Sequence, residues 1–363
     1  MDQRLFRSVG LLVGGALLAL GCGGSNSTPS CTPVSGKAEP FPTLDAWCQV
    51  SMVGGDVVPN PGVTPYNLNT PLFSDYAVKR RTVWMPPGAS ATYDGENVFT
   101  FPEGTVLTKS FGLPDDVRKA QPVVQWVETR VMWLTGGEWH AVSYTWDQAQ
   151  TKATVAPGGG VYPKTIIGPD GSTLDAQYLV PQANQCSQCH ASNSVTSLIG
   201  PKARNLNRDL TYPDGTTENQ LAHWTRLGLL TGAPDPSAAP RLPVWNDPST
   251  GTLDQRARAY LESNCAHCHS PGGDAKNSAL FLSTFVTDAY SYGVCKKPVA
   301  AGGGTGNLLY DIVPGQPDAS IMVHRLGSTD PSVAMPQIGR SVVDQAGLQL
   351  IEDWIASLPG SCP

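Results

Sequence analysis

The chain of 363 residues carries little charge and has no long run of one sign. Charged residues make up 15% of it, and 24 Lys and Arg stand against 30 Asp and Glu, for a formal net charge of -6. The longest cationic run is Lys79-Arg80-Arg81. Because a surface that binds nucleic-acid phosphates needs clustered cations, this composition argues against a nucleic-acid partner.

Long apolar runs and familiar catalytic patterns are also missing. No segment reaches the length of about 20 apolar residues that a membrane-spanning helix needs. Between residues 56 and 180 the sequence has no nucleophile constellation, no Gly-rich phosphate loop and no cluster of metal-ligand residues. We therefore assign no catalytic residue.

The first 22 residues have the pattern of an export signal. Arg4 and Arg7 precede an apolar run over 9–20, which is too short to cross a bilayer, and Cys22 follows directly after Gly21. The placement of Cys22 resembles a bacterial lipoprotein box, although Ala19-Leu20 departs from its usual order. We expect a lipid anchor on Cys22, a tether over 23–55 and a periplasmic or cell-envelope location at the outer membrane. Ordinary signal-peptide cleavage is the alternative.

Nine cysteines are informative in an exported chain, because its compartment is oxidising. Besides Cys22, four belong to two short motifs, and an even number remains: Cys31, Cys48, Cys295 and Cys362. Three connectivities are open to four cysteines. We favour Cys31 with Cys48 and Cys295 with Cys362, since each bond closes a loop within one expected module.

Two pentapeptides match the attachment motif of c-type haem, Cys186-Ser-Gln-Cys189-His190 and Cys265-Ala-His-Cys268-His269. Two thiols about one helical turn apart suit two thioether bonds to a porphyrin, and the adjacent His suits the proximal position on the iron. Cys186, Cys189, His190, Cys265, Cys268 and His269 therefore predict two covalently bound haem c groups.

Zinc binding and disulfide exchange are the competing interpretations of these motifs. Zinc hairpins join two separated Cys/His pairs in one tetrahedron, which a His directly after the second Cys does not favour. A redox-active Cys-x-x-Cys leaves the His unexplained at both positions.

The second haem ligand on each iron is predicted with unequal support. Met335, just before Pro336, is the candidate for the second motif, with filling of a core gap as the alternative. Nearby Arg340 either pairs with a haem propionate or is solvated. For the first motif no Met occurs between Cys189 and Cys268. There the candidates are His223, Met85 and Met132, or a vacant position.

The distribution of short strand-like and helical patterns predicts an α+β protein. A β-rich domain over 56–180, of sandwich or barrel type, is expected from runs at 98–101, 105–111, 123–134 and 139–146. A first helical haem module is expected over 181–235, with a helix at 217–227. A second, cytochrome c-like domain is expected over 242–363, with helices before the motif and at 343–358.

Five stretches of the sequence together resemble a largely uncharacterised bacterial family of exported di-haem c-type cytochromes: 66–76, 101–107, 199–207, 256–261 and 310–315. The resemblance implies a β-rich N-terminal region joined to haem-binding helices, haem residues at the six motif positions, and cysteines at Cys295 and Cys362. It implies no substrate.

These patterns predict a di-haem cytochrome that passes single electrons between periplasmic redox partner proteins. A di-haem peroxidase with an open first haem is one alternative, although such enzymes usually carry a motif near the start of the mature chain. A cytochrome subunit of a periplasmic dehydrogenase is the other.

Overall fold

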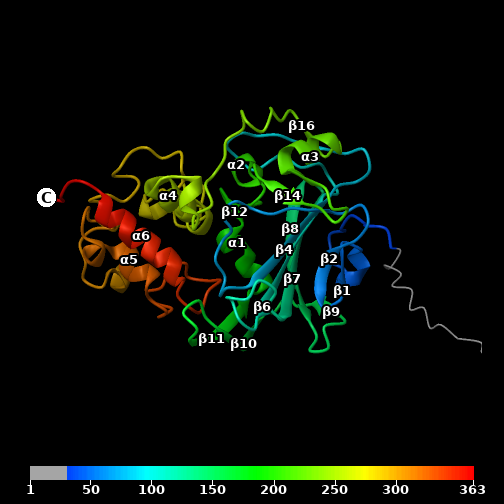
Figure 1. Cartoon of the computed structure of the whole chain (residues 1–363), viewed down its shortest axis with the longest axis horizontal. Coiled ribbons are helices and arrows are strands. Elements are labelled where there is room, and N and C mark those ends of the chain that lie inside the picture. The colour runs from blue at the N-terminus through cyan, green and yellow to red at the C-terminus, as the bar shows by residue number, and fades with distance from the viewer. Residues whose placement is uncertain (1–30) are drawn as a thin grey trace, which may run out of the picture.

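The computed structural model describes residues 31–363, and Cys22 with its expected lipid lies outside the described residues. Within this range no helix is both long and apolar enough to span a membrane. Figure 1 shows the main sheet towards one end of the long axis, the helices α4 to α6 at the other end, and α1 between them.

The main sheet is antiparallel and has six strands in the order β3-β4-β6-β7-β8-β9. Tight turns build it, and the β7–β8 turn uses Gly136 and Gly137, whose positive φ values suit a two-residue hairpin. The strands are β3 Thr64–Pro65, β4 Val78–Trp84, β6 Val106–Pro114, β7 Val124–Thr135, β8 Glu138–Trp146 and β9 Ala153–Val155.

The two faces of this sheet bury different parts of the chain. One face packs around Trp47 and Trp133 against the N-terminal segment, which includes the hairpin of β1 (Val50–Val53) and β2 (Asp56–Pro59). The other face shares a core with Leu198, Leu221 and Trp224, which come from the chain after the first motif. Segments far apart in sequence thus form one core beside the first motif.

The chain from 160 to 231 contains one longer hairpin, several strands of two or three residues, and three short α-helices. β10 (Gly160–Ile167) and β11 (Thr173–Val180) form a hairpin, and β16 (Leu230–Thr231) pairs in parallel with β5 (Ala91–Thr92). The remaining elements are α1 Cys186–Cys189, β12 Ala191–Ser192, β13 Val195–Thr196, α2 Ala203–Leu206, β14 Asp209–Thr211, β15 Thr217–Asn219 and α3 Gln220–Arg226.

The C-terminal part contains the two longest helices of the described residues. α4 (Leu253–Asn264) begins with a capping box between Thr252 and Gln255, and α6 (Gln345–Ser357) begins at the Asp344 cap. With α5 (Ile321–Leu326) they enclose a core around Leu261, Ile351 and Trp354. The second motif follows directly after α4.

The expected helical haem modules are wrong, because the described chain is β-rich, with 27% strand and 20% helix. Around the first motif the helices are single turns. The expected helix at 217–227 loses its first turn because β15 pairs with β14, so that Asn219 becomes the cap of α3, which is closed by Gly228 at φ 71°. The β-rich N-terminal region fits in part, as one open six-stranded sheet rather than a sandwich or barrel.

The positions of individual strands were predicted more accurately than the overall architecture. The runs at 105–111, 123–134 and 139–146 lie on β6, β7 and β8. The run at 98–101 makes only isolated bridges from Val98 and Thr100.

Two disulfides have the pairing favoured from the sequence. Cys31 bonds Cys48 with Cα atoms 5.7 Å apart, and Cys295 bonds Cys362 with Cα atoms 5.2 Å apart. The first disulfide joins Cys31, at the start of the described chain, to Cys48, which follows the Trp47 that packs on one face of the sheet. The second fixes the C-terminus beside Ile312.

Candidate functional site

The two Cys-x-x-Cys-His motifs, 79 residues apart in sequence, lie against each other. The Cys268 thiol donates to the Gln188 carbonyl at 3.2 Å, and the Asn193 amide donates to the Gly272 carbonyl at 2.9 Å. Ligand atoms of Cys189, His267 and Cys268 all lie within 4.8 Å of one another. All four motif cysteines are free thiols.

The first motif borders a large cavity between the sheet and the C-terminal part. Cys186, Cys189 and His190 form one side of it. The opposite sides come from β4, β6, β7 and β8, and from the loop around Ile338 and Arg340. The space between these side chains, counted with its opening to solvent, is about 1850 Å³.

His190 is held as a neutral imidazole. Its Nδ1 lies 3.0 Å from the Ser197 carbonyl, which fixes the ring and favours the proton on that nitrogen. Burial lowers the pKa of His190 to about 3. Its Nε2 makes no hydrogen bond within residues 31–363.

The second motif borders its own cavity of about 1470 Å³, again counted with its opening. Cys265, Cys268 and His269 line it together with Met322 and Met335. His269 Nδ1 lies 3.3 Å from the Ser278 hydroxyl, and burial lowers the pKa of this His to about 4. Both motif histidines therefore have the same arrangement, with Nδ1 engaged and the ring uncharged.

Arg340 holds the loop that carries Met335. Its guanidinium donates to the Met335 carbonyl at 2.8 Å and to the Ser328 carbonyl at 2.8 Å, and it also reaches the carbonyls of Arg325, Leu326 and Val342. The Arg340 guanidinium donates these hydrogen bonds to backbone carbonyls. Arg340 thus serves to shape the loop and keep Met335 beside the second motif.

The three candidates for the first distal position lie in different places. Met132 lines the first cavity from β7. Met85 is buried in the core shared by the sheet and the chain after the first motif, and it does not line that cavity. His223 is buried away from it, 2.9 Å from Glu218 Oε2 and stacked on the Tyr212 ring. Of the three candidates, only Met132 therefore lines the cavity that the first motif borders.

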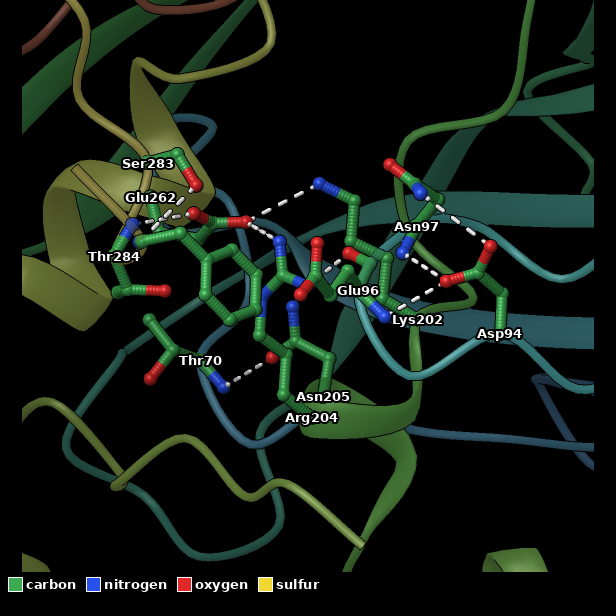
Figure 2. A network of polar contacts seen from close by, with 11 residues as sticks. Thr70, Asp94, Glu96, Asn97, Lys202, Arg204, Asn205, Glu262, Ser283 and Thr284 are labelled. Atoms are coloured by element: carbon green, nitrogen blue, oxygen red, sulfur yellow. Dashed lines mark hydrogen bonds and ion pairs between the residues drawn. The ribbon is translucent and has the colours of Figure 1, made fainter.

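A buried ion-pair network joins the chain after the first motif to α4. Figure 2 shows Glu262 on α4 accepting from Lys202 at 3.2 Å and from Arg204. The second carboxylate oxygen accepts from the Thr284 amide at 3.0 Å. Arg204 and Glu262 are almost fully buried, so this network fixes the two motif-bearing segments relative to each other.

The contact between the motifs brings together Cys189, His267 and Cys268. The closeness of the two thiols lowers the pKa of Cys189 and raises the pKa of Cys268. His267 Nδ1 is buried and has no hydrogen-bond partner within the described residues.

Sequence reasoning missed a row of cations on the sheet, formed by Arg81, Lys109 and Arg130, which faces the first cavity. The period-two pattern at 127–134 places Arg130 on a strand, and Arg81 belongs to the one cationic run. Their meeting depends on the register of β4, β6 and β7, for which the sequence carries no signal.

Comparison with known proteins adds no further constraint, because no protein-family model, no curated protein and no solved structure matches the chain.

Proposed function

We propose that the protein is a di-haem c-type cytochrome that transfers single electrons in the bacterial cell envelope. Cys186 and Cys189 would hold one haem and Cys265 and Cys268 the other. The observation that carries this proposal is that the two thiols and the imidazole of each motif line one cavity, with Cys189 also lining the cavity of the second motif. The sequence resemblance to exported di-haem cytochromes supports the same function. A lipid anchor at Cys22, supported by its lipoprotein-like position after Gly21, and periplasmic redox partner proteins are part of this proposal.

The chemistry of the donor set fits the proposal. An imidazole that ligates iron must be neutral, and burial keeps His190 and His269 uncharged at neutral pH. In metal-ligating histidines the other ring nitrogen also has a hydrogen-bond partner. Here the Ser197 carbonyl is the partner of His190 Nδ1, and the Ser278 hydroxyl is the partner of His269 Nδ1. Nε2 of each ring is thereby available.

Haem bound at these positions supplies a one-electron iron centre whose potential depends on its axial ligands. Met335, which lines the same cavity as His269 and whose carbonyl accepts from Arg340, is the proposed distal ligand of the second iron. Met132 is the proposed distal ligand of the first, because it alone of the three candidates lines that cavity.

Contact between the two motifs favours a carrier. Cys189 and Cys268 place the two attachment positions side by side, so groups bound there are neighbours. Neighbouring groups allow an electron to enter at one site and leave from the other.

A second candidate rests on Cys189, His267 and Cys268, whose three ligand atoms suit a thiolate-rich transition-metal site. Because Cys189 and Cys268 are needed by both, haem attachment and this site exclude each other.

The test is the mass and metal content of the purified full chain after production in a host that attaches haem c. The proposal expects two covalent haems, and one fewer in each of Cys186→Ala/Cys189→Ala and Cys265→Ala/Cys268→Ala. Cys295→Ala/Cys362→Ala, which removes a structural disulfide, is the matched control and keeps both. A chain with no haem and one zinc, lost in His267→Ala, overturns it.

A further inference from the structure

Three cations lie in one row across the sheet on the face toward the first cavity. Arg81 on β4 pairs in register with Lys109 on β6, and Lys109 pairs with Arg130 on β7. The next residue in the row is Ser143 on β8. All four side chains line the cavity. Like charges at directly opposite positions of neighbouring strands repel each other.

The carboxylates near this row do not neutralise it. Glu128 is fully buried. It forms an ion pair with Arg130 and accepts a hydrogen bond from the Tyr178 hydroxyl at 2.7 Å. Of the two carboxylates that line the cavity, Glu262 serves Lys202 and Arg204. The other, Asp344, accepts from the Tyr260 hydroxyl and the Gly347 amide.

Arg81, Lys109 and Ser143 are therefore left with unused donors. Arg81 is only 5% exposed, and among the described residues its Nη2 has no partner although Nη1 donates to Asn67. Ser143 is 3% exposed, and its hydroxyl has no partner in that part of the chain either. Within residues 31–363 the Lys109 ammonium makes no hydrogen bond or ion pair. Burial and the neighbouring cations lower the pKa of Lys109 well below its usual value.

We propose that Arg81, Lys109 and Ser143 bind the carboxylate of a ligand that occupies the first cavity. Buried unpaired donors such as Arg81 Nη2 and the Ser143 hydroxyl cost free energy unless an acceptor reaches them. A guanidinium suits a carboxylate, and a carboxylate beside Lys109 favours the charged form of its amine.

The other residues that line the cavity indicate the chemistry of the rest of the ligand. Around the row, Leu68, Phe73, Leu107, Met132 and Leu198 form an apolar surface. The ligand therefore has a large apolar body with an acidic end. Two sources share this chemistry: the propionates of a haem held by Cys186 and Cys189, which rests on the proposed function, and a free apolar carboxylic acid.

The variants that test the site are Arg81→Gln and Lys109→Met, each of which keeps most of the unbranched stem of the side chain and removes the charged group. Arg80→Gln is the matched control, because Arg80 is the next residue of the same strand, lies on the opposite face and pairs with Asp56 at the surface. Circular dichroism checks that all three fold.

In the first arm, the midpoint potentials of the haem-loaded full chain are measured by optical redox titration. If propionates occupy the site, Arg81→Gln and Lys109→Met shift the potential of one haem, and Arg80→Gln shifts neither. In the second arm, octanoate is added to the same proteins in a calorimeter. If a free acid is the ligand, octanoate binds the wild type saturably, and either variant weakens it about 10-fold or more, as one charged hydrogen bond of about 1.5–3 kcal/mol implies.

Potentials and octanoate binding that are the same in Arg81→Gln, Lys109→Met and Arg80→Gln overturn the inference. A wild-type chain that carries no haem overturns the proposed function instead. In that case the octanoate titration of the haem-free chain still decides whether the cation row binds a carboxylate.

Discussion

Replacing Glu262 by Gln removes the negative charge at the centre of the network that joins the two motif-bearing segments. The side chain keeps its size, but it no longer neutralises Arg204, which is 4% exposed. Breaking a buried ion pair by removing one partner costs about 3–5 kcal/mol, because the other charge stays buried without compensation.

The protonation equilibrium of Glu262 gives a second route to the magnitude. Burial alone would raise its pKa, but Lys202 and Arg204 overcome this and lower the pKa from the usual 4.5 to about 2. At about 1.36 kcal/mol for each pKa unit, the carboxylate contributes about 3 kcal/mol to folding. Because the folded-state pKa is the lower one, this contribution is complete above about pH 4.5 and is lost as the pH falls toward 2.

The assay is urea unfolding of wild type and Glu262→Gln between pH 7 and pH 2.5, followed by tryptophan fluorescence. We expect the variant to be about 3 kcal/mol less stable at pH 7, with the difference shrinking steadily below about pH 4.5. Glu138→Gln, an exposed strand residue without an ion pair, is the control and should change stability by less than about 0.5 kcal/mol. A Glu262→Gln variant as stable as wild type at pH 7, or a difference that does not depend on pH, would refute the reasoning.

Further outcomes are expected at the second motif and the disulfides. Met335→Ala should lower the reduction potential of one haem, because a thioether ligand raises it, whereas Met52→Ala on the distant β1 should leave both potentials unchanged in a redox titration. Arg340→Gln should destabilise the Met335 loop, seen as faster amide exchange at Met335, since the charged bonds to its carbonyl are lost; unchanged exchange would contradict this role. Cys295→Ser/Cys362→Ser should cost about 4 kcal/mol and Cys31→Ser/Cys48→Ser about 3 kcal/mol in urea unfolding, because the first bond spans 67 residues and the second 17; the reverse order would contradict the loop-entropy argument.

Local patterns in the sequence located several elements but not their assembly. Alternation around Val131 predicts β7, and apolar spacing before Cys265 predicts α4. The helical modules failed because periodicity over 217–227 does not register that Thr217–Asn219 pairs with another short strand. Strand pairing is a tertiary effect that overrides a weak helical pattern.

The candidate site was predictable to the extent that its chemistry is written in contiguous residues. Cys-x-x-Cys-His names the motif residues, and Met335 stands out as a Met after the second motif. Other features depend on segments that come together from distant positions in the sequence. These features are the contact between Cys189 and Cys268, the His267 Nδ1 without a partner among the described residues, and the cation row. Arg340 was paired from sequence with a propionate or with solvent, whereas it binds backbone carbonyls.

The optical spectrum of the haem-loaded protein, oxidised, reduced, and reduced under carbon monoxide, tests the central claim most directly. If the protein is an electron carrier with Met132 and Met335 as distal ligands, both haems are low-spin and neither binds carbon monoxide. A haem that is high-spin or binds carbon monoxide would contradict the account, because an open iron site favours a peroxidase-type enzyme over a carrier.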